Sequence, residues 1–217
     1  MLFRSVLEAY YYQIYAGGYN VDWSMYSRHG NASMTASCSD IRPVPSELRS
    51  PMAMLPDGIS QYYTKYTEAY GIPVLAAQTV PDTAVSRACY VLRFLLADRA
   101  DLRQAYYQSY GRVAIIPHHS SLKSIPEYLD IHPDFSLSTR GLGAIPRIPV
   151  STAGEENILC YEDGINSEED ILIREIAVGI LHLAARKVKP GVMDNLQSIY
   201  EVALESGWWE STYAEHS

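Results

Sequence analysis

Apolar residues follow helical spacing in the first half of the chain. After Pro81-Asp82 they recur at i, i+3, i+4 and i+7, which predicts an amphipathic helix. Shorter helices are expected at 61–70 and at about 101–110. Cys89 lies inside the main stripe, where a buried inert thiol is favoured over a nucleophile. The stripe comprises Val85, Ala88, Cys89, Leu92, Leu95 and Leu96.

Two short apolar runs, 72–75 and 112–116, predict buried strands. Residues 117–170 carry five prolines and are expected to be mostly loop. A long irregular stretch in a compact domain often forms the wall of a functional site. With the helices, these strands predict an α+β fold that is rich in helix and has a small sheet.

A central helix is predicted at about 168–186. Ser167-Glu168-Glu169-Asp170 has the pattern of a capping box, and the apolar run 171–183 follows it. This run is apolar on nearly every side, so we expect the helix to be central and buried. A last helix begins at Pro190, and its stripe is expected to be buried: Val192, Leu196, Ile199, Val202 and Ala203.

Residues 1–60 differ from the rest of the chain, because they are rich in tyrosine and proline. We expect this segment to pack on a main domain formed by residues 61–217. The crowded tyrosines indicate either amphipathic packing, with each ring buried and each hydroxyl in water, or a surface on which a ligand stacks. They are Tyr10, Tyr11, Tyr12, Tyr15 and Tyr19.

Charge and cysteine content narrow the choice of partners. The 217 residues carry a formal net charge of −8, which argues against nucleic-acid binding because phosphate contacts need a basic face. No charge-free apolar run approaches the roughly 20 residues of a membrane helix.

Cys38, Cys89 and Cys160 allow one disulfide without defining its pairing. The first residues lack the apolar region of a signal peptide. A cytoplasmic protein and an extracellular one whose leader has been removed therefore stay equal alternatives.

Ionisable residues interrupt the predicted central helix. At about 100° per residue, Glu175 and His182 fall within roughly 20° of each other, separated by a rise of about 10 Å. A bound molecule would be needed to bridge them. Arg174 and Glu175 need partners if they are buried, because an unpaired buried charge is costly.

The segment Arg174-Glu175-Ile176-Ala177-Val178 resembles the zinc-binding helix of gluzincin-type metallopeptidases, whose motif is H-E-x-x-H. It is most similar to the lethal-factor-like branch. There a second helix, a glycine-containing turn, a tyrosine and then a glutamate ligand follow the zinc helix. Residues 195–206, Gly207 and Tyr213 resemble the first three of these features.

Two upstream segments also resemble relatives in that branch, Arg140-Gly141-Leu142-Gly143 and Glu155–Cys160. The resemblance spans about 62–214 as a pattern. It implies a zincin-like fold for the main domain.

The chain departs from this family at the metal ligands. The first ligand position holds Arg174 and the second holds Val178, and neither side chain donates a lone pair to zinc. The chain ends at Ser217, before the position of the third ligand. Only Glu175, as general base, and Tyr213, as oxyanion stabiliser, match the family. Three protein ligands are needed to hold a catalytic zinc, so we expect no metal or other cofactor.

Two functions follow from this pattern. In the first, the chain is a catalytically inactive zincin-like protein that acts as a binding or assembly module for a protein partner, and Arg174 neutralises Glu175 in the former zinc cleft. In the second, Glu175 is the acid/base of a metal-free enzyme, assisted by Tyr213 or His182, and acts on a small apolar molecule. A zinc peptidase with unforeseen ligands, such as His182, is less favoured. The sequence leaves open whether Arg174 faces Glu175 and whether the chain forms a homo-oligomer.

Other polar clusters are weaker candidates for a site. His118-His119 and His132 form either a metal site with Glu127 or a solvated loop. Glu155-Glu156 has the form of a carboxylate pair, but neighbours in sequence seldom face one site. One of them is expected to cap a helix or to pair with Arg140.

Overall fold

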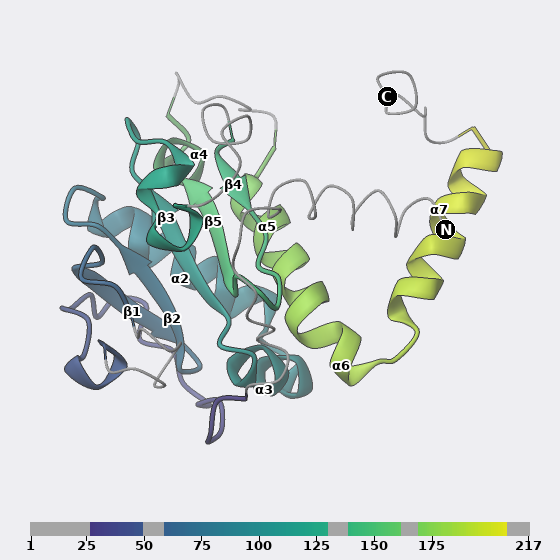
Figure 1. Cartoon of the computed structure of the whole chain (residues 1–217), viewed down its shortest axis with the longest axis horizontal. Helices are drawn as coiled ribbons and strands as arrows, with labels where there is room; N and C mark the ends of the chain where they lie inside the picture. Colours follow the sequence, from purple (N-terminus) through teal and green to yellow (C-terminus); the bar gives the residue numbers. More distant parts are fainter. Residues whose placement is uncertain (1–26, 50–58, 130–138, 162–168, 208–217) are drawn as a thin grey trace.

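The computed structural model describes residues 27–49, 59–129, 139–161 and 169–207. A five-stranded mixed sheet lies at its centre, in the order β1-β2-β3-β5-β4 (Figure 1). Strands β2, β3 and β5 run parallel, whereas the outer strands β1 and β4 are antiparallel to their neighbours. The strands are β1 (Lys65–Ala69), β2 (Ile72–Ala76), β3 (Arg112–Ile116), β4 (Gly141–Leu142) and β5 (Val150–Gly154).

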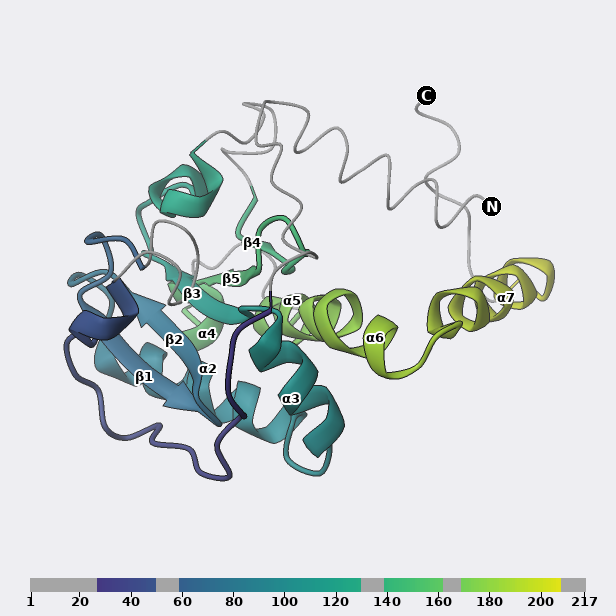
Figure 2. The ribbon, with the colours of Figure 1, turned by 60° about the horizontal axis from the view of Figure 1, so that its bottom comes forward.

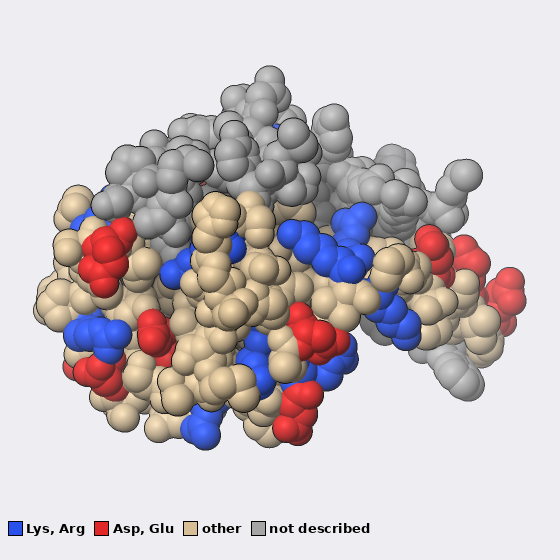
Figure 3. All heavy atoms as spheres, turned by 90° about the horizontal axis from the view of Figure 1, so that it is seen from below, with Lys and Arg blue, Asp and Glu red and all other residues tan. Residues whose placement is uncertain are grey.

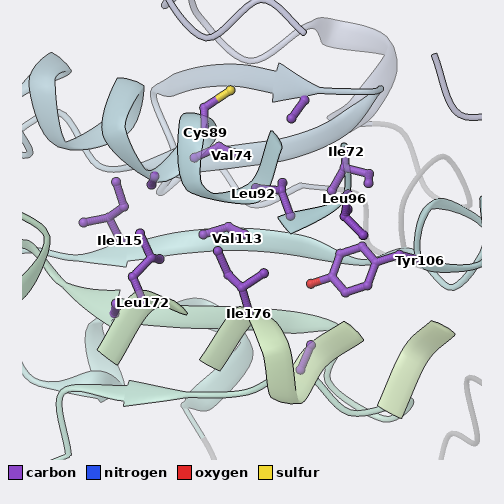
Figure 4. Close-up of a cluster of buried hydrophobic side chains, with 14 of the residues drawn as sticks. Ile72, Val74, Cys89, Leu92, Leu96, Tyr106, Val113, Ile115, Leu172 and Ile176 are labelled. Atoms are coloured by element: carbon purple, nitrogen blue, oxygen red, sulfur yellow. The ribbon is translucent and has the colours of Figure 1, made fainter. Parts of the chain in front are cut away.

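Helices cover one face of this sheet and irregular segments cover the other. Between the sheet and helices α2 and α5, apolar side chains such as Leu92, Val113 and Ile176 form the main core (Figure 4). The opposite face packs against loops and short 3₁₀ turns through residues such as Leu48 and Tyr128. The α-helices are α2 (Asp82–Leu95), α3 (Ala100–Gln108), α4 (Glu155–Leu159), α5 (Ile171–Ile180), α6 (Arg186–Val188) and α7 (Val192–Glu205). The chain therefore has the α+β fold that its sequence predicts.

The helix expected at 61–70 is wrong, because these residues enter a β-hairpin. Strand β1 pairs with β2 across a turn at Tyr70 and Gly71, which have φ values of 59° and 76°. Two consecutive residues with positive φ are typical of the tight turns that join hairpin strands. Tyr66 and Thr67 are both buried although they face opposite sides of the sheet. The strand consequently lacks the polar face that would have revealed its period.

The stretch 117–170 contains more regular structure than expected. It supplies β4, β5 and α4, and β5 lies between β3 and β4 in the sheet. Strand β5 is buried along its whole length, yet it contains Ser151 and Thr152. Their hydroxyls are satisfied locally: Ser151 Oγ donates to the Glu175 carbonyl at 2.9 Å, and Thr152 Oγ1 accepts from Leu142 N at 3.0 Å. This strand escaped prediction because small polar residues replace the expected apolar run.

A disulfide joins Cys38 to Cys89, and Cys160 is free and exposed. The expectation of a free thiol at Cys89 is therefore wrong. The bridge fixes the segment 27–49 to α2, and the same segment forms isolated β-bridges with β1 at Ala69 and Tyr66. The disulfide and the β-bridges together hold this segment along the edge of the sheet.

The predicted central helix is present, but one of its sides faces solvent. Helix α5 begins at Ile171 and continues through a π-helical turn, Leu181–Ala185, into α6. It packs against β5 and α2, whereas Ile173 and Arg174 are exposed. The uniform apolarity of the sequence hid this difference between the two sides.

Helix α7 forms where the sequence predicts it, but its stripe is not buried as expected. It projects away from the sheet, and none of its residues is buried (Figures 1 and 2). Ile199 is 65% exposed and Val202 is 56% exposed. Amphipathic spacing indicates which face can be covered, but not whether the domain core covers it.

Within the described residues, no helix combines the length and the apolar character needed to cross a membrane.

Replacing both bridged cysteines, in the variant Cys38→Ala with Cys89→Ala, is expected to lower the free energy of unfolding by about 2–4 kcal/mol. The disulfide closes a loop with a sequence separation of 51, so its loss restores entropy to the unfolded chain. Urea denaturation measures the change, and Cys160→Ala serves as the control because its thiol is exposed. Equal stability of the double variant and the parent would contradict this role of the bridge.

Candidate functional site

Short contacts from α4 fix the start of α5. Asn157 accepts a hydrogen bond from Ile171 N at 2.9 Å and donates one to the Glu169 carbonyl at 2.7 Å. Asp170 caps the helix, because its carboxylate accepts from Ile173 N at 2.9 Å. The cap is thus Asp170, whereas Ser167 of the expected capping box lies outside the described residues. These bonds fix the N-terminal end of α5, the helix that carries Arg174 and Glu175.

The hairpin of β4 and β5 lies directly against α5. A Cβ atom added to Gly143 would lie 2.4 Å from Val178 Cγ1 and 3.2 Å from the Glu175 carbonyl oxygen. Any side chain at this position would therefore push the helix from the sheet. Val178 is half-buried against this hairpin. This close approach places both the backbone carbonyl and the side chain of Glu175 against the β4–β5 hairpin, at one edge of the sheet.

Glu175 is buried, and Arg174 holds its carboxylate. Arg174 places Nε and Nη2 each 2.8 Å from Glu175 Oε1, and its Nη1 lies 2.5 Å from Glu169 Oε2. The backbone N–H of Gly143 also donates to Glu175. The Arg174 side chain is 46% exposed and that of Glu175 only 9%. A half-solvated guanidinium thus covers a nearly buried carboxylate.

Opposing effects act on the pKa of Glu175. Burial raises this pKa above its ordinary value, since the charged form loses its hydration. The charge and hydrogen bonds of Arg174 act in the opposite direction, and burial prevails. The carboxyl group is therefore a weaker acid than a free glutamate, although a cation lies beside it.

The residues at the family's metal-ligand positions do not fit zinc. Arg174 is cationic and directs its guanidinium at Glu175, and Val178 presents only methyl groups. Within residues 27–49, 59–129, 139–161 and 169–207, no three His, Cys, Asp or Glu side chains are grouped as a metal site requires.

His182 lies on the π-helical turn that packs against α3 and is 8% exposed. Burial, with a further contribution from the charge of Arg186, lowers its pKa to about 4. The imidazole is consequently neutral at physiological pH. Glu175, by contrast, lies against the β4–β5 hairpin. Tyr213, the other residue proposed to assist Glu175, lies outside the described residues, as does His132.

The two upstream segments that resemble the family meet through a buried ion pair. Arg140 Nε lies 2.5 Å from Glu156 Oε1, and Nη2 lies 2.7 Å from Oε2. The same guanidinium donates to the carbonyls of Pro117 and His118, each at 3.2 Å. The sequence-based pairing of Arg140 with one of the two glutamates is confirmed for Glu156. This contact fixes the loop after β3 to the helix after β5.

Glu155 points to a different set of groups, so the two adjacent carboxylates do not share one site. It accepts from His118 N at 3.2 Å and from the Tyr161 hydroxyl at 3.0 Å. The rings of His118 and His119 stack with centroids 4.2 Å apart, and Tyr161 packs beside His118. These contacts anchor the loop that follows β3.

Glu127, a candidate metal ligand with His118 and His119 in the sequence, instead belongs to a cluster with Arg112 and Tyr63 on the opposite face of the sheet, which the sequence analysis did not predict. It receives Arg112 Nη2 at 2.7 Å and the Tyr63 hydroxyl at 2.5 Å. Burial raises the pKa of Tyr63. The available signal was Arg112 itself, a charged residue that opens an otherwise apolar strand and therefore needs a partner.

Comparison of the chain with family models, with curated proteins and with solved structures gave no match. The zincin-like character of the chain accordingly stays a prediction from its residues.

Acidification is expected to destabilise the protein through His182. Between pH 6.5 and about 4, the unfolded chain binds a proton at this residue that the folded chain does not. Stability is therefore lost as the pH falls through this window, by up to about 3 kcal/mol. The variant His182→Gln should lose that part of the pH dependence in urea titrations, whereas the exposed His119→Gln should keep it. An unchanged slope in His182→Gln would contradict a buried neutral imidazole.

Removing the cation beside Glu175, in Arg174→Met, is expected to cost about 1–3 kcal/mol at pH 7. Because burial raises the pKa of Glu175, the folded chain binds this proton more tightly than the unfolded one, and this group's contribution to stability falls as the pH rises above 4.5. The cost should therefore shrink toward pH 4, and Glu175→Gln in the same background should restore stability. Arg99→Met, which breaks the exposed pair with Asp101, is the control. Equal losses for both variants at both pH values would show that the burial of Glu175 is immaterial.

Proposed function

We propose that the chain is a zincin-like domain without peptidase activity that acts as a binding or assembly module for a protein partner. The position of Arg174 carries this proposal. In the resembling peptidases its place belongs to a metal ligand, but here the guanidinium binds the carboxylate that would serve as general base.

Peptide hydrolysis by a zincin needs a metal held by three ligands and a carboxylate free to accept a proton. Arg174 and Val178 do not fit the metal, and Oε1 of Glu175 receives two donors from one guanidinium. These residues support a structural role for the pair, in which the half-solvated cation closes the former cleft over a buried carboxylate.

Exposed apolar side chains support a role in binding. Phe94 and Met34 are each 79% exposed, and Tyr90 lies one turn before Phe94 on the outer side of α2. Aromatic and methionine side chains are enriched at protein interfaces. The Cys38–Cys89 disulfide supports an extracellular setting, because such bonds persist in oxidising compartments.

A metal-free enzyme that uses Glu175 as its acid/base is the second candidate. The raised pKa of Glu175 favours it, since a carboxyl group with a raised pKa is a better proton acceptor than an ordinary glutamate and keeps its proton to higher pH. Such a reaction would require Arg174 to leave Oε1. Turnover of a small apolar molecule that disappears in Glu175→Gln while the fold persists would establish this candidate in place of the first.

Zinc loading combined with a peptide-cleavage assay tests the proposal. After equilibration with excess zinc and dialysis, the purified chain should hold no stoichiometric metal and should cleave no member of a generic peptide library. Arg174→His with Val178→His and a grafted downstream glutamate segment should gain zinc affinity if the helix has the family geometry. One zinc per unaltered chain, with cleavage that a chelator stops, would refute the proposal.

A further inference from the structure

The outer side of α2 carries aromatic rings between cationic groups. Tyr90 and Phe94 are exposed one turn apart, whereas Leu92 on the inner side is buried in the main core. The Arg93 guanidinium lies 6.0 Å from the centre of the Tyr90 ring, and Arg87 is exposed one turn before Tyr90. Neither arginine forms an ion pair with a carboxylate of the described residues. We call these four exposed residues the α2 face.

Met34 extends the α2 face at the end of the helix. Arg103 Nη1 donates to the Leu96 carbonyl at 3.2 Å, and its Nη2 lies 4.0 Å from Met34 Sδ. Met34 is as exposed as Phe94. Aromatic residues, methionine and arginine are the residues enriched at protein interfaces, so the composition of this face is typical of a docking surface for a protein.

The exposed side of α7 has the opposite charge. Ile199 and Val202 are exposed, and Glu205 follows them at the same spacing of three residues. Asp194 and Glu201 are exposed as well, and acidic side chains gather on this end of the molecule (Figure 3). Glu205 forms no ion pair with a basic group of the described residues. We call Ile199, Val202 and Glu205 the α7 face.

We propose that two copies of this chain exchange their α7 helices, so that the α7 face of each docks on the α2 face of the other. Within one chain the two helices lie apart, because α7 projects away from the sheet while α2 packs on it (Figures 1 and 2). Both faces are therefore open to a second molecule. The inference rests on the proposed binding function and names its protein partner as a second copy.

The order and spacing of the side chains match when the two helices run antiparallel. Along α2, Arg87, Tyr90 and Phe94 follow one another at rises of about 4.5 and 6 Å. Counted backward from Glu205, the residues of the α7 face follow at about 4.5 Å each. Arg87 then meets Glu205, and the aromatic rings meet the two aliphatic side chains.

The charge of the whole chain favours the same contact. Two copies with a formal net charge of −8 repel each other over most of their surfaces. The cationic α2 face and the acidic end of α7 are regions where the approach of a second copy is instead attractive. Such complementarity directs an encounter to one orientation.

A twofold exchange closes the assembly at a dimer, because each copy then offers and receives one α7 helix. Helix α7 has 14 residues, so a contact strip along it is about 21 Å long and about 10 Å wide. Two such contacts bury roughly 850 Å² in total, which is the size of weak, transient complexes. We therefore expect a dimer that forms at tens to hundreds of micromolar protein.

Sedimentation velocity of the full chain from about 1 to 500 µM tests the exchange. The expected result is a monomer at low concentration and a dimer as the largest species at high concentration. The dimer should be weaker in 0.5 M than in 0.05 M salt, since salt screens exposed charges. A monomer at every concentration, or oligomers that grow beyond the dimer, would overturn the proposal.

Charge reversal identifies the contact. Arg87→Glu and Glu205→Arg should each raise the dimer Kd about tenfold, because the exposed pair occurs twice in the dimer. An equimolar mixture of the two variants should dimerise as well as the parent, since one contact is then native and the other has its charges exchanged. Glu47→Arg, the same change at an exposed site outside both faces, is the matched control and should not raise the Kd. A mixture that stays monomeric would contradict the pairing of Arg87 with Glu205.

Phe94→Ser tests the apolar part of the contact. The ring is exposed in the single chain, so the variant should keep the parent Tm while its dimer Kd rises about tenfold or more. An unchanged Kd would overturn docking on the α2 face.

These results are separable from the test of the proposed function. A chain that stays monomeric, holds no zinc and cleaves no peptide would refute the exchange and leave the binding function with a different partner. Stoichiometric zinc with chelator-sensitive cleavage would refute the proposed function whatever the oligomeric state.

Discussion

The ion pair between Arg174 and Glu175 is the interaction on which the functional account depends. A carboxylate with 9% of its side chain exposed needs a partner, and two nitrogens of one guanidinium at 2.8 Å provide it. The same geometry keeps Oε1 from acting as a free base. The direction of the Arg174 side chain therefore determines both the electrostatics of Glu175 and the chemistry open to its carboxylate.

Several contacts hold this pair in place from outside the helix. Asn157 fixes the start of α5, and the lack of a side chain at Gly143 lets the β4–β5 hairpin approach it closely. Arg140 and Glu156 in turn join the loop after β3 to α4. The segments 140–143 and 155–160 thus have a structural role in this chain that does not depend on a metal.

Sequence patterns predicted the helices better than the sheet. Helix α2 was recognisable because its apolar stripe repeats over several turns, and α5 because its apolar run is too long for a strand. Strand β1 was mistaken for a helix, since both of its faces are buried, and β5 was missed because Ser151 and Thr152 interrupt its apolar run. The pairing of Cys38 with Cys89 depends on contacts distant in sequence, which spacing does not encode. At the site, the need of Glu175 for a partner was predictable from burial, whereas the direction of the Arg174 side chain was not.

A crystal structure of the chain grown or soaked in a millimolar zinc salt would show whether Arg174 keeps zinc away from Glu175. We expect the Arg174 guanidinium to stay on the Glu175 carboxylate, within about 3 Å, with no ion between α5 and the β4–β5 hairpin. An ion about 2.0–2.2 Å from a Glu175 oxygen, with Arg174 turned away into solvent, would contradict this expectation.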